Sequence, residues 1–433
     1  MDKDLLLDAG KDLLRLALLE NGRLAELLVE AKGPETGIAV KPSGEGKPGS
    51  IFRGKVIRVV QGMQAAFVDI GLPKNAFLHV KDIMPVELDN ASGDDEGDDR
   101  VEVREKTPDI EELLSQGQEL TVQIIKELSG NKGPRITTRV SLTGKYMVLI
   151  PGSNGIGISK KITDAKERKR LKNLIKSLDP GQSGVIVRTA AQDLTEGQIE
   201  ADFQTLMKRK TDLEEAEKRG AVPRCLYREQ DILYEAVREY LTPEINRFLI
   251  NDVQVYEALR AIVAETAPHL LSKVQLYSKS YELFSFYSVE GDIEEALSRK
   301  VRLKSGAYLI FDRTEALTVV DVNSGKYTGR YDKEETALKI NLEAAAELAR
   351  QLRLRNVGGI VIADFIDMES PENKALVLQK LRDEVKADKV QTVIVGITSL
   401  GLVEMTRKKV RLPLYDSMRQ VMGRNPLYPA NQG

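Results

Sequence analysis

Two short apolar segments that end in acidic residues organise the C-terminal half of the chain. They are residues 316–323 (ALTVVDVN) and 359–367 (GIVIADFID). Both are short runs rich in apolar and β-branched residues, which is the pattern of a strand. Residues 333–355 between them have the spacing of a helix. A strand, helix and strand in this order predict a right-handed βαβ unit, so the two strands should be parallel and their acidic ends should meet at one sheet edge.

The alternation of side chains brings several polar groups to this edge. Asp321 and Asn323 share one face of the first strand, and either Asp364 or Asp367 of the second could converge with them. Carboxylate and amide oxygens without a nearby His or Cys suit a hard cation such as Mg²⁺. Alternatively, these residues cap the following helices or face solvent. We favour a metal site that handles phosphate, because cationic residues flank the two strands in sequence: Lys326, Arg330, Arg353 and Arg355.

The N-terminal pattern indicates strands. Residues 4–30 hold two apolar runs separated by Glu20-Asn21-Gly22, a sequence typical of a hairpin turn, although their leucine content would also permit a helix. Residues 50–83 and 119–126 form short β-rich runs with glycine turns, which predict a small barrel of the OB type. Its cations alternate with aromatic residues, as on surfaces that stack unpaired bases, although Phe67 and Phe77 could equally be core residues.

The middle of the chain is predicted to be α/β. A basic helix at 160–176 precedes a strand at 184–190, and Arg188-Thr189 at the strand end could clamp a phosphate or be an ordinary surface pair. Long helices follow at 196–218 and 229–240, and another is expected at 292–302. Near the C-terminus, residues 390–398 should extend the sheet of the βαβ unit, with a basic helix at 404–411 over it.

Composition narrows the function classes. The 433 residues carry a net charge of −2, and the acidic run 94–99 accounts for five negative charges. One Cys and two His argue against a disulfide framework, a zinc site within the chain or a histidine-based triad. The leucine-rich start is interrupted by charged residues, so it does not resemble a signal peptide, and a cytoplasmic location is expected.

The chain resembles the ribonuclease E/G family of bacterial endoribonucleases. The resemblance rests on DVNSG (321–325), residues 341–368, EMTRKKVR (404–411), FRGKV, AAFVDIG and IVRTA (186–190). It implies an α/β multidomain fold in which an RNase H-like domain is split by an S1-type OB-fold barrel and an α/β sensor domain, and is followed by a DNase I-like domain. The implied domains are 1–48 with 234–296, 49–137 (the barrel with its acidic insertion), 138–233, 297–420 and a tail at 421–433.

The resemblance also implies site residues. It selects Asp364 over Asp367, so that Asp321 and Asp364 hold one Mg²⁺ with assistance from Asn323. It assigns Arg188 and Thr189 to a 5′-monophosphate, and Phe67, Phe77 and Lys126 to single-stranded RNA. The implied activity is Mg²⁺-dependent hydrolysis to 5′-phosphate and 3′-hydroxyl ends, at A/U-rich sites, in rRNA and tRNA processing and mRNA decay. The rival interpretations are a non-catalytic RNA-binding scaffold and a phosphatase of small substrates.

Two departures from the family pattern change the expected partners. The CPxCxG segment that shares zinc between subunits is absent, because the region reads MRQVMGRNPLYPANQG. No zinc link is therefore expected, and any homodimer should be weaker than in zinc-linked relatives. A second phosphate-sensing arginine expected in the loop 152–157 is also missing, which predicts weaker sensing of the 5′ end.

Overall fold

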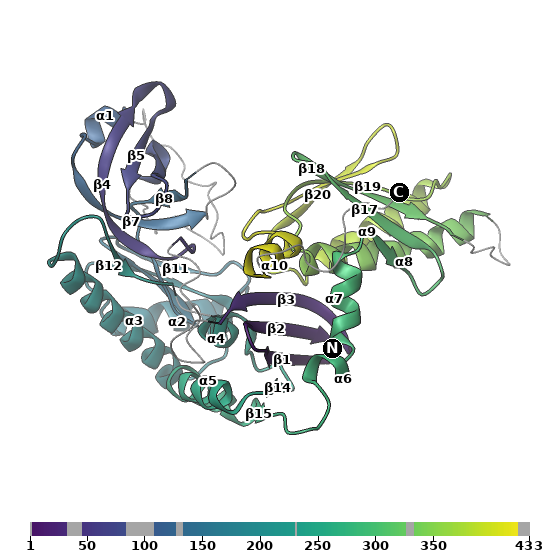
Figure 1. The fold of residues 1–433 in the computed structure, drawn as a ribbon, viewed down its shortest axis with the longest axis horizontal. Coiled ribbons are helices and arrows are strands. Elements are labelled where there is room, and N and C mark those ends of the chain that lie inside the picture. Colours follow the sequence, from purple (N-terminus) through teal and green to yellow (C-terminus); the bar gives the residue numbers. More distant parts are fainter. Residues whose placement is uncertain are drawn as a thin grey trace. The chain divides into compact units, whose positions relative to one another are not determined.

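The computed structural model describes residues 2–32, 46–83, 108–126, 133–229, 232–325 and 333–422. The chain divides into two compact units. The first comprises residues 1–41, 243–258 and 272–433, and the second comprises residues 42–242 and 259–271. Over the residues that the structure describes, each unit contains two sheets (Figure 1).

The first sheet of unit 1 is built from leucine-rich strands. Its order is β15-β14-β1-β2-β3, with β14 parallel to both β1 and β15. The expected hairpin is confirmed: β2 and β3 pair through Asn21 and Gly22, whose φ angles of 51° and 76° suit the tight turn. The strands are β1 (Lys3–Ala9), β2 (Leu13–Glu20), β3 (Arg23–Ala31), β14 (Arg247–Ile250) and β15 (Val274–Leu276).

The second sheet of unit 1 contains the predicted βαβ unit. Its order is β16-β17-β18-β19-β21-β20, and β18 and β19 are parallel as expected. The connecting helix is α8 (Lys333–Leu354), and α9 (Pro371–Val385) follows β19. The strands are β16 (Lys300–Arg302), β17 (Tyr308–Arg313), β18 (Leu317–Asn323), β19 (Gly359–Asp364), β20 (Thr392–Ile397) and β21 (Val403–Arg407).

Alternation along β18 and β19 separates the two faces of this sheet. Val320, Val322, Val361 and Ala363 point into a core that they share with α8 and α9, and both helices lie along the sheet in Figure 1. The residues between them in sequence, including Asp321, face the other way and are partly or fully exposed. The acidic groups therefore occupy the face opposite the helices.

The expected basic helix at 404–411 is wrong, because residues 403–407 form strand β21 between β19 and β20. Val403, Met405 and Arg407 alternate as buried residues, which is the period of a strand. Arg407 is buried because its guanidinium is paired with Asp388, at 2.7 Å from Nε to Oδ2. The strand at 390–398 is real, but as β20 it reaches the sheet only through β21.

The remaining helical elements of the first unit border its sheets. The helix expected at 292–302 begins earlier and ends at Leu297, and β16 follows. Three short helices complete the unit: α6 (Leu283–Phe286), α7 (Val289–Leu297) and α10 (Leu414–Met422). Helix α5 (Val253–Thr266) and the 3₁₀ turn Pro268–Lys273 lie where the chain passes between the two units.

Unit 2 contains the predicted barrel. Strands β4, β5, β6, β8 and β7 close on themselves because β4 pairs with both β5 and β7. Strand β13 extends the sheet beside β4. The bounds are β4 (Ile51–Val60), β5 (Ala65–Asp69), β6 (Ala76–His79), β7 (Glu119–Lys126), β8 (Arg135–Thr137), β13 (Arg224–Tyr227) and the short helix α1 (Ile110–Leu113).

The second sheet of unit 2 has the order β11-β12-β10-β9 and packs against two helices. Strands β11 and β12 are parallel and end near each other. The expected helix at 229–240 is split into a short α-helix and a π-helical segment, Ala236–Tyr240. The bounds are β9 (Leu142–Thr143), β10 (Met147–Pro151), β11 (Ile156–Ile158), β12 (Ser183–Val187), α2 (Ala165–Ser177), α3 (Glu196–Glu217) and α4 (Ile232–Glu235).

Candidate active site and RNA-binding residues

Asp321 and Asp364 are direct partners across two parallel strands. The register of β18 and β19 places Asp321 opposite Asp364, one position after Val320 and Ala363. Adjacent strands are about 4.8 Å apart, and partners in register point to the same face. Both side chains are exposed on the face opposite α8 and α9. The two carboxylates are therefore close enough to bind one cation.

Asn323 supports this pair from the same strand face. Its Nδ2 donates a hydrogen bond of 2.7 Å to Oδ2 of Asp321. The bond engages one oxygen of the carboxylate and fixes its rotation, so the other oxygen remains available. Asn323 also retains an amide oxygen, which is a good ligand for a hard cation.

The electrostatics of the pair favour a bound cation. Partial burial and the charges of Asp321 and Asp367 raise the pKa of Asp364 above its usual range. Within the described residues, neither Asp321 nor Asp364 forms an ion pair with a lysine or arginine. Two adjacent negative charges without a counter-charge are unfavourable, and a divalent ion would neutralise them. The donor set of oxygens fits Mg²⁺.

The donor set is small. The described part of the chain contains no cluster of three or more His, Cys, Asp or Glu side chains suited to a metal. Asp367 lies three residues beyond the end of β19 and is exposed, so it is not a register partner of Asp321. An ion held by Asp321 and Asp364 would take its other ligands from Asn323, water or phosphate oxygens.

The expected cationic rim is partly wrong. Arg353 is bound to Glu20 and Glu26 at 2.9 and 2.8 Å, and Arg355 packs over the ring of Phe311. A crossover helix runs antiparallel to its strands, so residues at its C-terminal end lie at the sheet edge opposite the strand ends. Lys326 and Arg330 lie outside the described residues.

The barrel brings the expected RNA-binding residues into one row. Phe67 pairs with Phe77, Phe77 with Arg135, and Arg135 with Lys126 across the neighbouring strands β5, β6, β8 and β7. The rings of Phe67 and Phe77 contact each other edge to face, with centroids 6.0 Å apart. Both rings are partly exposed and Lys126 is fully exposed, so they are not simply core residues.

Sequence reasoning missed Arg135 as a member of this row. Its strand has only three residues and follows a glycine-containing segment, so its partner strands could not be inferred from the sequence. Asp82 holds its guanidinium with two hydrogen bonds of 2.9 and 3.2 Å. This places a fixed cation between the aromatic pair and Lys126.

Arg188 and Thr189 follow the end of β12, as predicted. Thr189 Oγ1 lies 2.8 Å from Ser159 Oγ at the end of the parallel strand β11. The Arg188 guanidinium donates to the carbonyls of Gly144 and Lys145 and also to Glu239. The two residues thus lie at the end of β12, beside the end of the parallel strand β11, but the arginine has a carboxylate partner that the sequence did not reveal.

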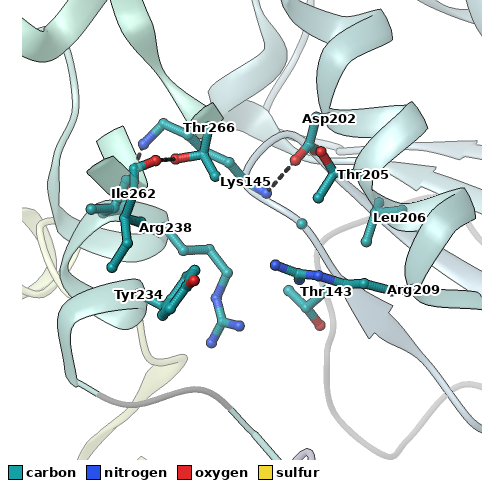
Figure 2. A pocket seen from close by; sticks show the side chains of 12 residues that line it. Thr143, Lys145, Asp202, Thr205, Leu206, Arg209, Tyr234, Arg238, Ile262 and Thr266 are labelled. Carbon is teal, nitrogen blue, oxygen red and sulfur yellow. Dashed lines mark hydrogen bonds between the residues drawn. The ribbon is translucent and has the colours of Figure 1, made fainter. Parts of the chain in front are cut away.

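A pocket lies behind this segment in unit 2. Figure 2 shows Arg209, Arg238 and Tyr234 around its opening, with Lys145 and Asp202 on its wall. Lys145 is buried, and its Nζ donates to the carbonyls of Val237 and Leu241. The lysine therefore ties the π-helical segment to the start of β10.

Comparisons with known proteins agree with this architecture. Residues 141–410 match the ribonuclease E/G family, and residues 45–139 match the S1 RNA binding domain. Ribonuclease G of Salmonella typhimurium (strain SL1344) is 40% identical over 95% of this chain and 81% of its own length. Ribonuclease G of Escherichia coli (strain K12) is 39% identical with the same coverage. Ribonuclease E of that strain is 37% identical over 95% of this chain but only 37% of its own length.

These matches cover the barrel, the sheet that contains β10 and β12, and the strands that carry the paired aspartates. None of the helices in the described part of the chain is long and apolar enough to cross a membrane. The chain belongs to the ribonuclease E/G family and is an endoribonuclease with an S1 RNA-binding domain.

Proposed function

We propose that this endoribonuclease hydrolyses single-stranded RNA with Mg²⁺ and leaves 5′-phosphate and 3′-hydroxyl ends. The observation that carries the proposal is the register of β18 and β19, which sets Asp321 opposite Asp364. Family membership supports cleavage within RNA chains, and we extend it to rRNA and tRNA processing and mRNA decay in the cytoplasm.

The roles of the site residues follow from their geometry. Asp321 and Asp364 would hold the ion, and Asn323 keeps the Asp321 carboxylate in one orientation through its 2.7 Å hydrogen bond. When bound, Mg²⁺ neutralises charge on the scissile phosphate and lowers the pKa of a water ligand. The exposure of both aspartates leaves room for a polymer to reach them.

The barrel row would bind the unpaired substrate. Bases can stack on Phe67 and Phe77, while Arg135 and Lys126 attract the phosphates. Stacking accepts every base, so sequence preference should be loose, with A/U-rich sites favoured. Because the cations displace counterions, the affinity should fall with salt.

Arg188 and Thr189 would bind a 5′-monophosphate. A guanidinium and a hydroxyl that directly follow the end of β12 offer the donors that a phosphate needs. For assembly, we propose a homodimer weaker than in zinc-linked relatives. The segment without cysteines lies largely beyond Met422, outside the described residues.

The test is cleavage of a labelled, 5′-monophosphorylated, A/U-rich oligonucleotide in Mg²⁺ or in EDTA. The parent enzyme should cut only in Mg²⁺, and Asp321→Asn and Asp364→Asn should each lose cleavage while still binding the RNA. Sensitivity of the products to a phosphatase and a 3′-end ligase identifies the termini. Normal cleavage by both variants would disprove the proposed site.

A further inference from the structure

The guanidinium of Arg188 is already bound by a carboxylate. Its Nη2 donates to Oε2 of Glu239 at 2.7 Å, and its Nη1 donates to the carbonyl of Gly144 at 3.0 Å. A terminal phosphate would bind the same guanidinium through similar charge-assisted hydrogen bonds. The two anions would therefore compete for one cation.

Glu239 belongs to a chain of alternating charges. Its Oε1 accepts a hydrogen bond of 2.9 Å from Arg238 Nε, and Arg238 Nη1 donates to Glu229 at 2.6 Å. The side chains of Arg188 and Glu239 are only 21% and 23% exposed, so water screens their attraction less than at an open surface. Burial lowers the pKa of Arg238, but Glu229 and Glu239 together raise it above its ordinary value.

The position of Glu239 is fixed by the backbone around it. It lies in the π-helical segment Ala236–Tyr240, an irregularity that often marks functional sites. Lys145 holds the carbonyls of Val237 and Leu241 on either side of Glu239. The carboxylate is therefore presented to Arg188 by a rigid support rather than by a loose surface side chain.

Glu239 also forms an ion pair with Arg238, which can persist when another anion binds Arg188. Arg238 lines the pocket of Figure 2 together with Arg209, and both guanidinium groups extend into its opening. A carboxylate that leaves Arg188 can keep its contact with Arg238, so exchange breaks the ion pair with Arg188 and not the one with Arg238.

We propose that Glu239 is an internal competitor that sets how strongly the enzyme prefers RNA with a 5′-monophosphate over RNA with a 5′-hydroxyl. The inference rests on the proposed role of Arg188 as a phosphate ligand. Glu239 is bound to Arg188 until a terminal phosphate displaces it, and a 5′-hydroxyl lacks the charge to do so.

The experiment compares kcat/KM for one oligonucleotide carrying either a 5′-monophosphate or a 5′-hydroxyl. Glu239→Gln should raise the ratio of the two values by roughly threefold to tenfold, the range expected for releasing a half-buried ion pair. The gain should come from a lower KM for the phosphorylated RNA, with the value for the hydroxyl form unchanged. Melting curves establish that the variants are folded.

Two controls separate the possible failures. Glu229→Gln removes the same charge from the other side of Arg238 and should change the ratio less than twofold. Arg188→Gln should bring the ratio to one, with or without Glu239→Gln.

The outcomes are distinguishable. If Arg188→Gln leaves the ratio unchanged, the proposed phosphate site fails. Suppose that Arg188→Gln brings the ratio to one, but Glu239→Gln leaves the ratio unchanged or lowers it. Glu239 then only positions Arg188, and its proposed role as a competitor is disproved. Equal gains from Glu239→Gln and Glu229→Gln would mean a general effect of charge, which also overturns the inference.

Discussion

Replacing Asp364 by Asn should make the metal-free enzyme more stable while it abolishes cleavage. The amide has nearly the same shape as the carboxylate but removes one of two negative charges that face each other across β18 and β19. The raised pKa of Asp364 shows that the folded state disfavours its charged form, through partial burial first and Asp321 second. The substitution removes both penalties.

The magnitude follows from the spacing of the strands. Two unit charges about 4.8 Å apart repel by about 0.9 kcal/mol in bulk water and by about 3.5 kcal/mol at an effective dielectric constant of 20. Both carboxylates are exposed, so the smaller value applies. We expect Asp364→Asn to gain about 1 kcal/mol of unfolding free energy at pH 7 in EDTA.

The gain should depend on pH. A carboxyl group whose pKa is raised by folding stabilises the protein below its ordinary pKa, and this contribution is lost as the pH rises through the raised value. Asp364 therefore destabilises the metal-free fold at neutral pH and not at acidic pH. The advantage of Asp364→Asn should disappear when the pH falls below the ordinary pKa of an aspartate.

Urea unfolding of the whole protein, with and without Mg²⁺, measures the effect. Mg²⁺ should stabilise the parent enzyme and leave Asp364→Asn unchanged, and cleavage by the variant should fall at least about a hundredfold. Asp367→Asn is the matched control. It removes an exposed charge that contributes least to the raised pKa of Asp364 and is not a register partner of Asp321, so it should stabilise less and keep the response to Mg²⁺. A variant less stable than its parent in EDTA, or one that still responds to Mg²⁺, would refute the reasoning.

Three further predictions address the barrel, the core and the site. Phe67→Ala and Phe77→Ala should each weaken binding of single-stranded RNA by about tenfold in fluorescence anisotropy, and unchanged affinity would mean that the rings do not stack bases. Asp388→Ala should lower the unfolding free energy by about 3–5 kcal/mol, because the Arg407 side chain is only 3% exposed and would lose its carboxylate partner, although it keeps hydrogen bonds to Asn356 and Val357. A loss below about 1 kcal/mol in urea would contradict this. Asn323→Ala should reduce kcat by about tenfold or more with little change in RNA affinity, since it frees the Asp321 carboxylate to rotate.

The parts of the fold set by local periodicity were predictable. Alternation and the βαβ order placed Asp321 beside Asp364, and the Asn21-Gly22 turn located its hairpin. The strand at 403–407 was mistaken for a helix because its charged residues hide the alternation. Arg407 reads as a surface residue until its partner Asp388, 19 positions earlier, is known.

Contacts between distant segments could not be predicted. Arg188 meets Glu239 across 51 positions, and no local pattern joins them. The same holds for Arg353, whose partner Glu20 lies 333 positions away. Its positive charge suggested that Arg353 belonged to the phosphate site. Helix α8 runs antiparallel to β18 and β19, however, so its C-terminal end lies at the sheet edge opposite Asp321 and Asp364. Such pairs are fixed by the order of strands in a sheet, which a single sequence leaves open.

The parallel pairing of β1 with β14 has a consequence for biosynthesis. Leu5 is the register partner of Phe248, so the first sheet lacks this neighbour until that residue has left the ribosome. At about 5–20 residues per second, the wait is roughly 12–50 s. During that time one edge of strand β1 has no hydrogen-bonding partner, although its leucines are buried in the finished fold. The barrel is synthesised entirely within this interval, so its strands can pair before β14 is made. Nascent chains that stall before Arg247 should therefore be the form that chaperones retain.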